Sequence, residues 1–95
     1  MRIVGYIENK PCKITVFHQG FRYMVKFEDG LYEQSFKFRE SENVKGLPDI
    51  QNIIDDQFIE EVMNRFIDMK NSTSNLMERY IHQISGEYFE EETII

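Results

Sequence analysis

Two tight-turn signals in the first half of the chain constrain its fold more than any other feature. Asp29-Gly30, flanked by alternating apolar and polar residues, is a strong β-hairpin signal, and Gln19-Gly20 predicts a second hairpin. With a two-residue loop at each place, both hairpins put Tyr23, Val25 and Phe27 on the same apolar face. A slip of one residue in either hairpin would turn that set towards water, so the two predictions support each other.

These loops specify the pairing of three strands. The predicted cross-strand pairs are Phe27–Tyr32, Val25–Gln34, Tyr23–Phe36 and Phe21–Phe38 in one hairpin, and Val16–Tyr23, Ile14–Val25 and Cys12–Phe27 in the other. A further strand is expected at residues 2–8, but its register stays open. Either Ile3, Gly5 and Ile7 face the core, or Val4 and Tyr6 do. Because sequential strands usually neighbour one another, strands at 2–8, 12–18, 21–28 and 31–39 predict an antiparallel meander.

The second half of the chain has helical periodicity. Pro48 and Asp49 are typical of a helix start, and apolar residues at spacings of three and four predict helix over 48–70. Asp55-Asp56 either caps a second helix or lies on the wet side of a continuous one. Residues 71–75 are weak helix formers and favour a break or a frayed turn, but whether they bend, break or continue the helix stays open. Helical spacing resumes over 75–86, with Gly86 as a C-cap.

The predicted fold class is therefore α+β: a four-stranded antiparallel meander, followed by two or three helices packed on one face of the sheet. Ninety-five residues make one domain, expected to span 1–86, with the meander at 1–39 and the helical part at 48–86. Phe58, Val62 and Phe66 should pack against the sheet. Residues 87–95 form an acidic tail that we expect to be disordered.

Composition limits the classes of function. The net charge is −6, and it divides into +2 over residues 1–46 (eight Lys/Arg, six Asp/Glu) and −8 over residues 47–95 (three against eleven). An acidic chain is a poor general binder of nucleic acid, so the net charge does not favour that partner. We find no signal-peptide pattern and no apolar stretch near the ~20 residues of a membrane span, so we expect a cytoplasmic protein with no membrane partner. The absence of Ala and the many Ile, Asn and Lys residues indicate AT-rich coding DNA, and we expect a bacterial origin.

No arrangement of residues predicts catalysis. Cys12 is the only cysteine, and His18 and His82 are the only histidines. Cys12 and His18 would lie ~20 Å apart along one extended strand, too far to act as a nucleophile–base pair. We therefore predict no catalytic residue, no metal site, no cofactor and no enzymatic activity.

The outer face of the predicted sheet is the first candidate surface. It gathers cations with one aromatic ring, a combination that suits an anion or single-stranded nucleic acid. An ordinary solvated face is the alternative. The predicted residues of this surface are Lys13, Phe17, Arg22, Lys26, Lys37 and Arg39. In the predicted register Lys13 lies opposite Lys26, and Arg22 lies opposite Lys37.

The second candidate surface is apolar. Apolar residues run from Ile50 to Ile84. Two helices that cover one face of a small sheet would not need so many of them, and surplus apolar surface usually marks an interface. The predicted dimer surface is Ile59, Met63, Ile67, Leu76, Met77, Tyr80, Ile81 and Ile84. We therefore expect a small interaction or regulatory protein that self-associates as a homodimer and binds an unknown protein partner. Single-stranded nucleic-acid binding is the alternative function.

Overall fold

The chain forms a four-stranded antiparallel sheet followed by two helices. The computed structural model describes the backbone of residues 1–94 and the side chains of residues 1–85. Its elements are β1 (Arg2–Ile7), β2 (Lys13–Gln19), β3 (Arg22–Asp29), β4 (Tyr32–Arg39), α1 (Leu47–Ile53) and α2 (Asp56–Ile94). The strand order β1-β2-β3-β4 is a meander, which confirms the predicted α+β class and sheet topology.

Both hairpins have a register two residues away from the predicted one. Gly20 and Gly30 have φ of 62° and 61°, and each is the first residue of its two-residue loop rather than the second. This arrangement suits a type II′ turn, in which only the first loop residue needs positive φ. Gln19 and Asp29 therefore pair within the ladders. A shift of two keeps every side chain on its predicted face, because strand side chains alternate with a period of two.

The shifted register corrects several predicted pairs. Tyr23 pairs with His18 and Phe38, Val25 with Val16 and Phe36, and Phe27 with Ile14 and Gln34. Phe21 was predicted to face the core. It instead follows Gly20 in the turn and is 81% exposed. Tyr23, Val25 and Phe27 are buried, which confirms the apolar face.

A bulge in β1 explains why no single alternation fits that strand. Ile3 pairs with Phe17 and Gly5 with Val16, so the extra residue lies between them. Ile7 lies in the core, while Ile3 is largely exposed on the other face. Gly5 packs closely on α1, because a Cβ there would lie 2.6 Å from a terminal side-chain carbon of Leu47, which would have to shift.

The core lies between the sheet and the two helices. Its buried residues are Ile7, Ile14, Val16, Tyr23, Val25, Phe27, Ile50, Ile54, Ile59, Val62 and Phe66. Val62 and Phe66 are fully buried, as predicted, and the Phe58 ring packs edge-on against Phe27 and Phe36, at centroid distances of 5.8 and 5.0 Å. Helix α2 also accepts a hydrogen bond at this contact, since Gln34 Nε2 donates to the Val62 carbonyl at 2.9 Å.

The two helices are separated at Asp55. The Phe58 backbone N–H donates to Asp55 Oδ1 at 2.8 Å, so Asp55 caps α2. Of the two predicted alternatives for Asp55-Asp56, the cap of a second helix is therefore confirmed. Pro48 lies in the first turn of α1, and the Asp49 carboxylate accepts the Lys45 backbone N–H at 3.0 Å. Within the described residues, neither helix combines the length and the apolar character needed to cross a membrane.

Helix α2 is one uninterrupted rod, and the predicted break at residues 71–75 is wrong. The Thr73 hydroxyl donates to the Met69 carbonyl at 3.0 Å, which satisfies this polar side chain inside the helix. Gly86 is not a C-cap, because the helix continues to Ile94. The side chains of the acidic tail lie outside the described residues, and its predicted disorder and the boundary at residue 86 stay predictions.

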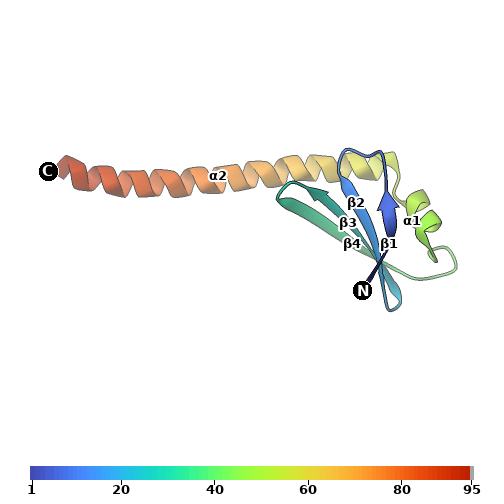
Figure 1. Cartoon of the computed structure of the whole chain (residues 1–95). Coiled ribbons are helices and arrows are strands. Elements are labelled where there is room, and N and C mark those ends of the chain that lie inside the picture. The colour runs from blue at the N-terminus through green and yellow to red at the C-terminus, as the bar shows by residue number, and fades with distance from the viewer. Residues whose placement is uncertain (95) are drawn as a thin grey trace.

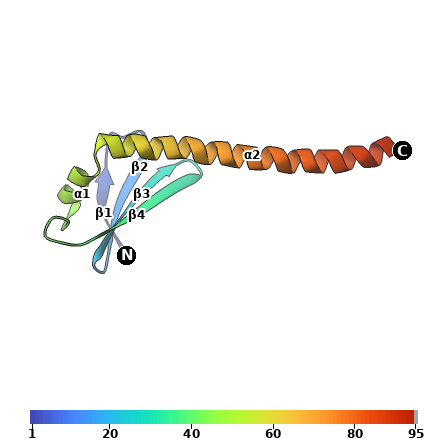
Figure 2. The same ribbon diagram turned by 180° about the vertical axis from the view of Figure 1, so that it is seen from behind.

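Figures 1 and 2, which view the molecule from opposite sides, show α2 crossing the sheet and then continuing alone far beyond it. The point of departure is the β3–β4 turn, where Lys70 Nζ lies 2.8 Å from Asp29 Oδ2. The extents of the molecule, 71 × 26 × 17 Å, reflect this overhang. We call residues 56–70 the core segment of α2 and residues 71–94 its extension.

Candidate functional site

The extension of α2 carries an apolar stripe with no neighbour in the described chain. Its residues are Leu76, Met77, Tyr80, Ile81 and Ile84, which are 46–57% exposed. Asn75, Glu78 and His82 lie on the opposite side of the helix, since 3.6 residues make one turn. In the described chain the stripe therefore faces solvent.

This stripe repeats the buried face of the core segment. Each of its residues follows a core-segment residue by eighteen positions, which is five helical turns and about 27 Å. The pairs are Phe58 and Leu76, Ile59 and Met77, Val62 and Tyr80, Met63 and Ile81, and Phe66 and Ile84. One straight helix thus presents the same face twice, first to its own sheet and then to solvent.

The structure divides the predicted dimer surface accordingly. Ile59 belongs to the core, and Met63 is partly buried against it, so both contribute to the packing of the core segment. Ile67 is 55% exposed, but it lies about 100° round the helix from Phe66 and outside the stripe. The other five predicted residues form the stripe. The eighteen-residue repeat is visible in the sequence, but because it makes the two faces alike, the position of the sheet is needed to separate the two groups.

The outer face of the sheet, which no described helix covers, is the second candidate surface. Directly opposite residues form four rows across it: Gln19, Arg22 and Arg39; Ile3, Phe17, Met24 and Lys37; Tyr6, Thr15, Lys26 and Ser35; and Lys13, Glu28 and Glu33. The first two rows hold three cations and no carboxylate, whereas the last two hold two cations and two carboxylates. The positive charge of this face is therefore concentrated at the end near the β2–β3 turn.

Two of the predicted cations are locally compensated. Lys26 Nζ lies 3.5 Å from a Glu33 carboxylate oxygen and 4.0 Å from Glu28, and it is 5.8 Å from the centre of the Phe17 ring. Lys13 lies opposite Glu28, not opposite Lys26 as predicted. These two lysines therefore do not add to the positive end of the face.

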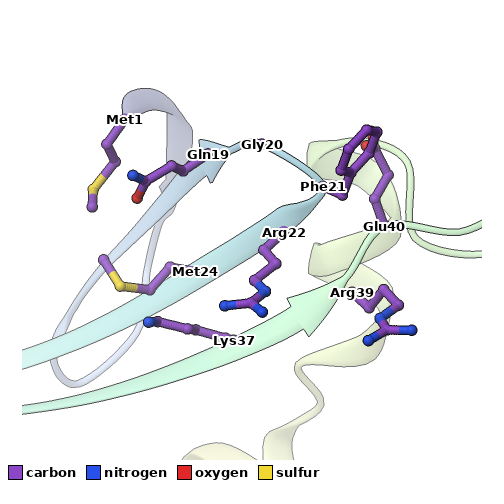
Figure 3. A pocket seen from close by; sticks show the side chains of 9 residues that line it. All are labelled: Met1, Gln19, Gly20, Phe21, Arg22, Met24, Lys37, Arg39 and Glu40. Carbon is purple, nitrogen blue, oxygen red and sulfur yellow. The ribbon is translucent and has the colours of Figure 1, made fainter.

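The other cations line a hollow of about 800 Å³ beside the β2–β3 turn. Its lining is Met1, Gln19, Gly20, Phe21, Arg22, Met24, Lys37, Arg39 and Glu40. Figure 3 shows the Arg22 and Lys37 side chains extending towards Met24, whereas Arg39 points the other way. Arg22 lies opposite Arg39 and not, as predicted, opposite Lys37. Like charges directly opposite each other destabilise a sheet, so this pairing has a cost unless an anion lies nearby.

Glu40 lines the hollow, but its carboxylate contacts two residues of the inner face of the sheet. Its Oε1 lies 3.5 Å from both the Tyr23 hydroxyl and His18 Nε2, and the His18 ring packs on Tyr23. Burial, and then the negative charge of Glu40, raises the pKa of the Tyr23 phenol, which therefore keeps its proton towards Glu40. Among the described residues, Arg22, Lys37 and Arg39 form no salt bridge with Glu40 or any other carboxylate.

Other reactive side chains do not converge on either surface. Cys12 is a free, half-buried thiol. Burial, and to a smaller degree the negative charge of Asp29, raises the pKa of this thiol. In the part of the chain that the structure describes, no group of three or more His, Cys, Asp or Glu residues is arranged to hold a metal ion. The two candidate surfaces are thus the features from which a function can be argued.

Comparison with known proteins adds no relative. No protein-family model, no curated protein sequence and no solved structure matches this chain.

Proposed function

We propose that this protein is a non-enzymatic interaction or regulatory protein of the cytoplasm and that it acts as a homodimer joined through the apolar stripe of α2. The observation that carries this proposal is the eighteen-residue repeat. The core segment needs its apolar face to cover the sheet, and the extension repeats that face where the described residues offer no surface to cover.

The extension needs a partner for its own stability. Isolated helices are marginal in water, and most helical stability in proteins comes from packing an apolar face. Residues 71–75 are weak helix formers, so intrinsic propensity adds little there. An uncovered helix of this composition would fray, whereas packing its stripe against another surface would stabilise it.

A second copy is the occupant that suits the stripe best. A two-fold interface uses the same patch on both subunits, and the stripe supplies one apolar patch per chain with no charged residue inside it. Met77 and Tyr80 at its centre belong to the residue types enriched at interfaces. The stripe spans well over 100° of the helix circumference, so each copy can present a broad apolar face to the other.

Light scattering on the purified chain tests the proposal, with a dimer expected at micromolar concentration. Tyr80→Glu puts a charge at the centre of the stripe, and a buried unpaired charge is strongly unfavourable, so this variant should be monomeric, with the dimer weakened by a factor of about 100 or more. The matched control is His82→Glu, which adds the same charge on the opposite side of the same helix and should stay dimeric. A monomeric wild type, or equal behaviour of the two variants, would contradict the proposal.

A further inference from the structure

We infer that the positive end of the outer sheet face is a binding site for a short single strand of nucleic acid. We call this site the basic end and define it by Phe17, Phe21, Arg22, Met24, Lys37 and Arg39. It lies on the sheet, away from the stripe of α2, and the inference does not depend on dimer formation.

The charge arrangement is the first argument. Arg22 and Arg39 lie directly opposite each other without a carboxylate between them, and Lys37 lies one row further along. The Arg22 and Lys37 head groups extend the same way along the face, and Arg39 points away from them (Figure 3). Cations that extend to two places suit successive phosphates of a strand better than a single small anion, because they can contact different phosphates.

The apolar residues at the same end of the sheet are the second argument. Phe21 is 81% exposed at the turn, and Phe17 and Met24 lie side by side on neighbouring strands, half-buried, with Ile3 completing their row. An exposed aromatic ring near cations can stack an unpaired base, and here Phe21 supplies that ring, with half-buried Phe17 as a second aromatic surface. A double helix keeps its bases stacked inside, so the aromatic part of the site would gain nothing from a duplex.

The dimensions of the site limit the length of strand that it can hold. The row from Ile3 to Lys37 crosses three strand spacings, about 14 Å in all. A sheet of this size stacks two or three bases in other folds that bind single strands. The hollow of about 800 Å³ at one end of the row is large enough for one of these nucleotides.

The acidic net charge does not exclude this site. Of the negative charge, −8 belongs to residues 47–95, which contribute none of the residues lining the hollow, whereas residues 1–46 carry +2. The two lysines and two carboxylates of the other two rows cancel, so the excess positive charge of this face comes from the three cations of the basic end. The inference therefore predicts modest affinity and a small number of phosphate contacts.

Fluorescence anisotropy with labelled 15-mers of dT and rU, and with a 15-base-pair duplex, tests the inference. Three phosphate contacts predict a log–log salt slope near −2, so affinity for the single strands should fall about twentyfold between 50 and 200 mM salt. Preference for dT or rU would tell DNA from RNA, and either result supports the site. The inference would be overturned if neither oligonucleotide bound at 50 mM salt, or if the duplex bound as tightly as the two single-stranded 15-mers. Full displacement of the oligonucleotides by 5 mM inorganic phosphate would also overturn it.

Two pairs of variants locate the site. Arg22→Glu should abolish binding, whereas Lys13→Glu, the same change at the compensated end of the same face, should alter affinity by no more than about twofold. Phe21→Ala should weaken binding about tenfold with an unchanged salt slope, because it removes stacking and no charge. Leu31→Ala is its control, since Leu31 occupies the same loop position in the other hairpin and is 99% exposed.

Both aromatic and control positions are exposed, so folding should be retained, and a thermal melt of each variant checks this. Phe21→Trp keeps an aromatic ring at this position and should bind the single strands as wild type does. Equal effects of Arg22→Glu and Lys13→Glu, or of Phe21→Ala and Leu31→Ala, would contradict the inference. Tyr80→Glu should bind the strands with the same slope as wild type, so failure of the dimer and failure of this site would be told apart.

Discussion

The two parts of α2 have the same apolar pattern and opposite surroundings. In the core segment, Val62 and Phe66 are fully buried beneath the sheet, while Tyr80 and Ile84, eighteen residues later, are 56% and 46% exposed. Periodicity creates the same face in both parts, because it depends only on the spacing of apolar residues along the helix. What covers that face depends on where the sheet ends. The comparison shows that an apolar helix face predicts a contact without saying with which surface.

The largest expected difference between the two parts is in stability. Phe66→Ala removes a fully buried ring and should lower the free energy of unfolding by about 3–5 kcal/mol, a large fraction of the 5–15 kcal/mol of a typical domain. Ile84→Ala, at the equivalent position of the extension, should cost less than about 1 kcal/mol in the monomeric Tyr80→Glu background. Urea unfolding of both variants measures the difference, and similar losses would show that the extension is part of the core.

A proline should uncouple the two parts. Ser74→Pro removes one helical hydrogen bond and clashes with the preceding turn, a cost of about 3 kcal/mol to the helix at that point. We expect the far-ultraviolet helical signal to fall and the dimer to dissociate, with the urea midpoint of the core unchanged in the Tyr80→Glu background. Ser74→Ala is the control and should leave the dimer intact. A lower core midpoint for the proline variant would mean that the extension supports the sheet.

The helix cap acts on the core segment first. Asp55→Ala leaves the Phe58 N–H without its side-chain acceptor and should cost about 1 kcal/mol. Asp56→Ala is the comparison, because Asp56 is exposed in the first turn and its Oδ1 is 3.3 Å from Lys10 Nζ in an exposed pair. It should cost a few tenths of a kcal/mol. Thermal melts rank the two variants. A larger loss for Asp56→Ala would show that Asp56, and not Asp55, stabilises the start of α2.

The smallest effect is expected at the boundary between the two parts. Lys70→Met removes the ion pair with Asp29 while keeping most of the aliphatic side chain. Both partners are partly exposed, so the loss should be about 0.2–1 kcal/mol and should shrink further in 1 M salt. A loss that stays the same in high salt would mean that Lys70 acts through packing and not through its charge.

The sequence by itself determined the sheet, its strand order and the buried side of β2, β3 and β4, whereas the bulge in β1 left the buried side of that strand open. Alternation alone decides the face, and it survived a two-residue error in the register of both hairpins because the period of a strand is two. The same error changed which charges lie opposite one another: Lys13 faces Glu28, and Arg22 faces Arg39. Alternation cannot report this, since pairing depends on the exact position of the loop. A glycine with positive φ at the first loop position settles it, and the pattern Gly-Phe and Gly-Leu at the two turns is the sequence trace of that choice.

Tertiary structure decided the rest. Five weak helix formers predict a break when read alone, yet residues 71–75 continue a helix that is already anchored by the core segment, and adding a residue to an existing helix avoids the cost of nucleation. Likewise, burial at Ile59 and exposure at Met77 follow from the edge of the sheet near the β3–β4 turn, not from any difference in pattern. Local spacing specifies which side of a segment is apolar. The surface that meets it is set by residues distant in sequence, and only their arrangement in space separates core from interface.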